Sequence, residues 1–151
     1  MIPAVRLNCL DRVLRSAARL IGRIPKFDHI SSYMRDILHW LPLRQRIAYR
    51  VAALVWRCLL GLAPVYLTEL CSPTLSARGS RSLRSVEHGL LSVPFARTST
   101  KQNRAFSVVG PSTWNGLPLV LRSLPRTPSQ TFLSQLKMVL FGRAGVGSAS
   151  E

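Results

Sequence analysis

Two sets of arginines recur at helical spacing, and each is able to contact a phosphate backbone. The sets are Arg12, Arg15, Arg19 and Arg23, and then Arg46, Arg50 and Arg57. At about 100° per residue, each set falls on one side of a helix. Tyr49 and Trp56 lie beside the second set and could stack on unpaired bases. Because arginine forms bidentate hydrogen bonds with phosphate, these residues predict a nucleic-acid contact.

The same spacing also has a purely structural explanation. An amphipathic helix exposes charged residues opposite its apolar side, and arginine stems cover part of a core. The lack of glutamates beside these arginines favours binding. Trp40, Trp56 and Trp114 are more often core anchors than base-stacking platforms, because large aromatic side chains are highly buried on average.

The charge of the chain favours the same class of partner. Among 151 residues, Lys and Arg number 21 and Asp and Glu number 6, so the net charge is +15. Only Lys26, Lys101 and Lys137 are lysines. This excess is typical of proteins that bind RNA, DNA or an acidic membrane surface. A basic fragment of a larger and better balanced protein would show it too.

Residues suited to catalysis are not grouped in the sequence. The six acidic residues are dispersed, whereas two-metal phosphoryl chemistry requires clustered carboxylates. Phosphate-binding glycine loops and nucleophile elbows do not occur. His39 lacks a nucleophile and an orienting partner, so packing at a helix junction is its expected role. Cys9, Cys58 and Cys71 have no zinc-binding spacing and favour a reduced, intracellular protein. We therefore expect no enzymatic activity, metal or cofactor, and no small-molecule substrate.

Apolar periodicity and Pro/Gly punctuation predict a small, mainly α domain. Helices are expected over residues 10–24, 28–38, 42–60, 64–71 and 129–141. The buried side of the first should comprise Leu10, Val13, Ala17, Leu20, Ile21 and Ile24. Residues 89–98 have strand character and could form a hairpin with residues 104–109. Trp114 is expected in a turn, or a single helical turn, packed by its indole.

Four segments follow from this pattern. A helical segment with the basic sets covers residues 1–71, and an irregular Ser/Arg-rich basic segment, with the hairpin as an alternative, covers 72–104. The Trp-containing turn and the C-terminal amphipathic helix cover 105–142, and a flexible tail covers 143–151. No apolar run reaches the length of about 18 residues that a membrane helix needs.

The N-terminal segment supports an alternative function. Residues 1–24 are rich in arginine and poor in acid, which resembles a mitochondrial presequence. As a basic amphipathic helix, this segment could instead lie on a membrane surface. The nucleus or cytoplasm is the favoured location, and the mitochondrion is the alternative.

Several segments, in a fixed order, resemble the C-terminal region of reverse transcriptases from LINE-type (non-LTR) retrotransposons. They are ILHWLPLRQRIAYRVAALVWRCLLGLAPVYLTEL, SRSLRS, GLLSVPFARTST, RAFSVVGPSTWNGLPLVLRS and TFLSQLKMVLF. RVLRSAARLIGRIPKFDHI resembles the segment that precedes them in that family. The likeness covers residues 11–142, and it depends on the order of the segments rather than on one motif.

The resemblance implies an accessory helical region after the polymerase thumb, touching template RNA or target DNA during target-primed reverse transcription. The paired aspartates of the polymerase lie upstream of the matching region, so none of the family's catalytic residues corresponds to a residue here. A further implied partner is the missing polymerase domain of a parent polyprotein. Met1, just before the match, is expected of a truncated element with its own start codon. The serine-rich spacing over residues 72–85 leaves open a relic with no selected function.

Overall fold

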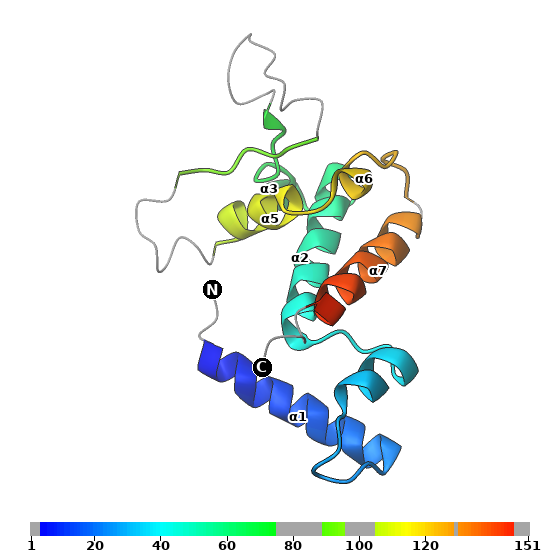
Figure 1. The fold of residues 1–151 in the computed structure, drawn as a ribbon. Coiled ribbons are helices and arrows are strands. Elements are labelled where there is room, and N and C mark those ends of the chain that lie inside the picture. The colour runs from blue at the N-terminus through cyan, green and yellow to red at the C-terminus, as the bar shows by residue number, and fades with distance from the viewer. Residues whose placement is uncertain (1–3, 75–88, 96–104, 129, 147–151) are drawn as a thin grey trace. The chain divides into compact units, whose positions relative to one another are not determined.

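A computed structural model describes residues 4–74, 89–95, 105–128 and 130–146, and nearly all their regular structure is helical (Figure 1). The helices are α1 Ala4–Gly22, the π-helix η1 Tyr33–Ile37, α2 Leu43–Leu59, α3 Val65–Thr68, α5 Phe106–Asn115, α6 Leu119–Arg122 and α7 Thr131–Val146. Extended pairing in these ranges amounts to one antiparallel bridge, between Pro73 and Leu91. The mainly α class predicted from the sequence is confirmed.

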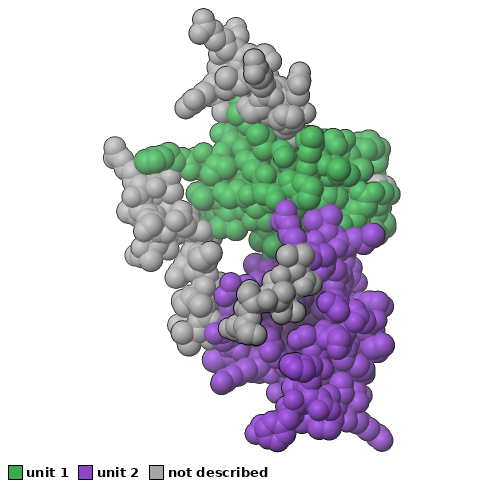
Figure 2. Space-filling model, viewed as in Figure 1, with its two compact units in different colours: residues 1, 48–136 green, residues 2–47, 137–151 purple. Residues whose placement is uncertain are grey.

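The chain divides into two compact units (Figure 2). Unit 1 comprises Met1 and Ala48–Leu136, and unit 2 comprises Ile2–Ile47 and Lys137–Glu151. The second part of α2, the three short helices and the first turns of α7 therefore belong to unit 1. Unit 2 contains α1, η1 and the remaining parts of α2 and α7.

Three aromatic rings from three helices form the centre of unit 1. Trp56 of α2 stacks on Phe132 of α7 with ring centroids 4.2 Å apart, and it lies 6.2 Å from Trp114 of α5. The centroids of Trp114 and Phe132 are 5.7 Å apart. Each ring belongs to a residue no more than 3% exposed. Because large aromatic side chains bury much apolar area, this cluster stabilises the packing of α2, α5 and α7 against one another.

A glycine allows α5 to lie close to α2. A Cβ atom on Gly110 would be 3.1 Å from the Phe106 ring and 3.3 Å from Cγ2 of Val55. Both distances are tighter than ordinary van der Waals contact, so a side chain at this position would push the two helices apart.

The end of α5 holds residues 89–91 through side chains. The Trp114 Nε1–H donates to the Gly89 carbonyl at 2.9 Å. The Asn115 carboxamide accepts from the Leu91 N–H at 2.9 Å and donates to the Leu91 carbonyl at 2.8 Å. The Asn115 carboxamide thus satisfies both the N–H and the carbonyl of Leu91, as a neighbouring β-strand would. Leu91 is 2% exposed, so these backbone groups need partners inside the protein.

The predicted hairpin is wrong. Residues 106–109, expected as its second strand, form the first turn of α5, and Leu91 pairs with Pro73 instead. Trp114 lies in a ten-residue helix rather than in a turn, although its indole is buried as expected. The β-branched residues Val108 and Val109 favour strands only weakly, and burial of the α5 side chains overrides that preference.

The predicted flexible tail also begins too early, because α7 continues to Val146. Most of the predicted irregular segment, and residues 147–151 of the tail, lie outside the described residues.

Unit 2 is built around the packing of α1 on the segment that follows it. Ala18, Ile30 and Met34 form its buried cluster, with partly buried side chains around them. The Arg19 guanidinium donates to the carbonyls of Pro25 and Asp28 and so fixes the turn after α1. The Tyr33 ring lies against the backbone of Gly22, where an added Cβ would be 2.7 Å from the ring.

The predicted buried side of the first helix is largely wrong. Leu10, Val13, Leu20 and Ile21 are all more than half exposed. The helix packs instead through Leu14 and Ala18, just beyond one edge of the apolar side that the sequence predicted. Helical periodicity locates an apolar side, but it does not show which part of that side a partner element covers.

Candidate nucleic-acid interface

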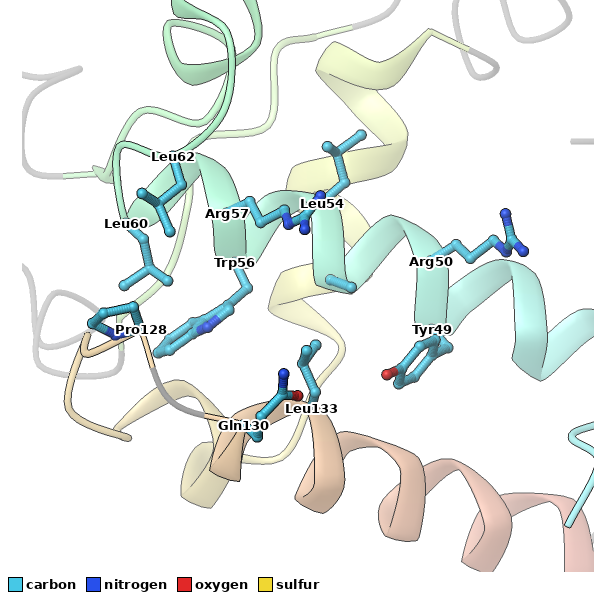
Figure 3. Close-up of a pocket in the computed structure, with 11 residues that line it drawn as sticks. Tyr49, Arg50, Leu54, Trp56, Arg57, Leu60, Leu62, Pro128, Gln130 and Leu133 are labelled. Carbon is cyan, nitrogen blue, oxygen red and sulfur yellow. The ribbon is translucent and has the colours of Figure 1, made fainter.

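A hollow of about 500 Å³ lies on unit 1 between α2 and the start of α7 (Figure 3). Its polar lining consists of Tyr49, Arg50 and Arg57 from α2 and of Gln130. Its apolar lining is Ala53, Leu54, Trp56, Leu60, Leu62, Pro128 and Leu133. None of the lining residues is acidic, so the hollow combines apolar walls with two full positive charges.

The register of α2 produces this arrangement. Tyr49, Ala53 and Trp56 recur at intervals of four and three residues, so they share one side of the helix. Figure 3 shows Tyr49 and Trp56 on that side, across from Gln130 and Leu133. Tyr49 is half-buried, which leaves part of its ring available to a ligand.

Arg50 and Arg57 are exposed and keep their charges available to an anion. Seven residues separate them, which corresponds to about 10 Å along the helix axis. The ion pairs among the described residues join Arg15 to Asp11 and Arg35 to Asp36, and neither involves these two arginines. A bound phosphate would therefore not have to displace a carboxylate from either arginine.

Trp56 does not serve as the predicted base-stacking platform. It is 3% exposed, and Phe132 and Trp114 occupy the space beside its ring. The alternative interpretation of Trp56 as a core anchor is confirmed. Arg46, from the same predicted set, belongs to unit 2 and lies 5.9 Å from the centroid of the Trp40 ring. A cation–π contact of this kind already stabilises the Arg46 guanidinium within unit 2.

The four arginines of the first set have different surroundings. Arg15 is paired with Asp11 at 2.8 Å, and Arg19 is bound to backbone carbonyls. Arg12 and Arg23 are exposed, and Arg23 follows the helix with φ 51°. The structure therefore leaves two arginines of this set, rather than four, with no hydrogen bond or ion pair inside the described part of unit 2.

The described cysteines and histidines differ in their surroundings. Burial raises the pKa of the Cys58 thiol, and it raises the pKa of Cys71 to about 12. Both thiols are therefore protonated at neutral pH and are poor nucleophiles. Cys9 is exposed, and His39 is exposed with φ 50°. Across the described ranges, no three His, Cys, Asp or Glu residues are grouped as metal ligands would be.

The sequence gives no indication of the α7 side of the hollow. Gln130 and Leu133 lie more than seventy residues beyond Arg57, and no spacing in the sequence connects them to it.

None of the described helices is long and apolar enough to span a bilayer. Comparison of the chain with protein-family models, with curated proteins and with solved structures finds no match.

Proposed function

We propose that this protein binds single-stranded RNA or DNA at the hollow on unit 1. The observation that carries the proposal is the placement of Arg50, Arg57 and Tyr49 on one hollow whose lining contains no acidic residue. The net charge of +15 supports it, since phosphate contacts supply most of the affinity in such complexes.

The dimensions of the hollow suit an unpaired strand. Its volume of about 500 Å³ falls within the range of ligand pockets, which is roughly 300–1,000 Å³. A base splayed from a single strand can enter such a space and stack on Tyr49, for about 1–3 kcal/mol. Arg50 and Arg57 would then bind phosphates on either side of it. The Gln130 carboxamide both donates and accepts, so it can pair with any base edge and adds little sequence preference.

The proposal gives the chain a binding role without chemistry of its own. Its resemblance to the C-terminal region of LINE-type reverse transcriptases supports this role, because such a region follows the polymerase and lacks the catalytic aspartates. In that setting, the arginines of the hollow would hold template RNA or target DNA while a separate polymerase domain copies the template.

Replacing Arg50 and Arg57 together by alanine is expected to weaken binding to single-stranded RNA about tenfold or more at 0.1 M salt. Two lost phosphate contacts should also make the slope of log K against log salt less negative by about 1.4. Both residues are exposed, so far-UV circular dichroism should be unchanged. Fluorescence anisotropy with a labelled oligonucleotide measures the affinity.

The matched control is the double variant Arg44→Ala and Arg126→Ala. These arginines are also exposed and lie outside the hollow, and their loss changes the net charge by the same amount. Its affinity should fall by a clearly smaller factor. Equal losses in the two double variants would mean that the total charge, rather than the hollow, binds the nucleic acid.

A further inference from the structure

Four large apolar side chains are exposed on one side of α1. Leu10, Val13, Leu20 and Ile21 have exposed fractions of 53%, 65%, 81% and 56%. Together with Ala17 they fall within an arc of about 100° on the helix and extend over about 17 Å of its axis. We call this set the α1 stripe. Exposed apolar side chains that gather on one side of a helix, rather than scatter singly, indicate an interaction site.

The packing of unit 2 leaves the α1 stripe uncovered. The apolar contacts of α1 with the cluster around Ile30 and Met34 pass through Leu14 and Ala18, and its other contacts come from Arg19 and Gly22 at the end of the helix. The residues of the stripe are therefore not needed for the core of unit 2, and their apolar character has no explanation there.

Positive charge lies on the neighbouring side of α1 and beyond its C-terminal end. Arg12 is exposed on the arginine side of α1, and Arg23 and Lys26 are exposed just beyond the end of the helix. The sequence of α1 contains one acidic residue, Asp11, which is already paired with Arg15 at 2.8 Å. An approaching anionic surface would thus meet no uncompensated negative charge on α1.

The combination of apolar and basic groups favours an anionic bilayer over a nucleic acid or a second copy of the chain as the partner of α1. A nucleic-acid backbone would pair with the arginines and leave the stripe in water. A second copy of the chain carries the same net charge of +15, so joining two stripes would bring like charges together. An anionic bilayer can both bury the stripe and pair with the basic side chains. Apolar side chains enter the acyl-chain boundary, and the anionic headgroups pair with arginine.

We propose that α1 lies in the plane of an anionic lipid bilayer, with the α1 stripe inserted into the headgroup and acyl-chain boundary. At this depth, roughly 5–10 Å, the stem of Arg12 can extend so that its guanidinium reaches the lipid phosphates. The side of α1 that carries Leu14 and Ala18 stays packed on the rest of unit 2. Binding should increase with the fraction of anionic lipid and decrease with salt.

Co-sedimentation of the full chain with lipid vesicles tests this proposal. The vesicles consist of phosphatidylcholine alone or with about 30% phosphatidylserine, which supplies the anionic surface. The double variant Val13→Ser and Leu20→Ser should bind the anionic vesicles about tenfold more weakly. In the control, Val65→Ser and Val120→Ser replace residues that are 72% and 71% exposed outside α1, and binding should change less than about twofold.

Binding by the wild-type chain that the stripe variant loses and the control keeps would support the proposal. Absence of binding to anionic vesicles would overturn it, as would equal binding by both double variants, which would show attraction by net charge alone. Self-association of the wild-type chain in buffer that only the stripe variant abolishes would assign the stripe to a second copy and would also overturn it. RNA binding should be the same in all three proteins, because none of these positions lines the hollow.

Discussion

Replacing Phe132 by alanine is expected to lower the free energy of unfolding of unit 1 by about 3–5 kcal/mol. Phe132 is 1% exposed, and its ring lies between α7 and the two tryptophans of α2 and α5. Removing it deletes the transfer energy of the ring and leaves a cavity beside Trp56 that the surrounding helices fill only in part. Urea denaturation followed by tryptophan fluorescence measures the change.

The matched control is Phe95→Ala, the same substitution in unit 1 at a residue that is 91% exposed. It should change the free energy of unfolding by no more than about 0.5 kcal/mol. If the two alanine variants were equally stable, α7 would not pack on α2 through Phe132, and the α7 side of the hollow would have no support.

Replacing Asn115 by alanine should cost about 2–3 kcal/mol of stability, because the N–H and carbonyl of buried Leu91 both lose their partner. Asn115→Asp separates the two contacts. The carboxylate still accepts from the Leu91 N–H, but its second oxygen faces the Leu91 carbonyl and repels it. Both variants can be measured by the same denaturation experiment.

The aspartate variant should also respond to pH. The Leu91 carbonyl and the partial burial of the site favour the protonated carboxyl, against one N–H that favours the carboxylate, so we expect the pKa of the new group to be raised in the folded state. The folded state then binds more protons than the unfolded state, and stability falls as pH rises through that range. Acidification should therefore restore part of the stability of Asn115→Asp and none of that of Asn115→Ala. Identical pH profiles would contradict the pairing of Asn115 with Leu91.

The sequence predicts the helices better than their packing. The long helix α2 follows from its apolar period and from Pro42 before it, and the structure places its ends within a residue of the prediction. The strand character of residues 104–109 was misleading, because Val108 and Val109 fit a strand as well as a helix when no partner is known. The turn signals around Gly116 mark the end of α5 rather than an isolated turn.

The candidate site could be predicted only on its α2 side. The spacing of Tyr49, Arg50 and Arg57 is local, so periodicity brings these residues together. Trp56 lies beside them on the same helix, and whether it points to solvent or to the core depends on where Phe132 and Trp114 lie. That information is contained in contacts between distant segments, which a single sequence does not reveal. For the same reason, the packed side of α1 cannot be located from the sequence.

The most direct test of the proposed function is a salt series of fluorescence anisotropy with the wild-type chain and a labelled single-stranded RNA. We expect binding at low salt, with log K falling linearly against log salt by about 0.7 for each phosphate neutralised. Circular dichroism of the same samples establishes that the chain is folded. Absence of binding at low salt by a folded chain, or affinity that does not change with salt, would contradict a nucleic-acid role for the arginines of the hollow.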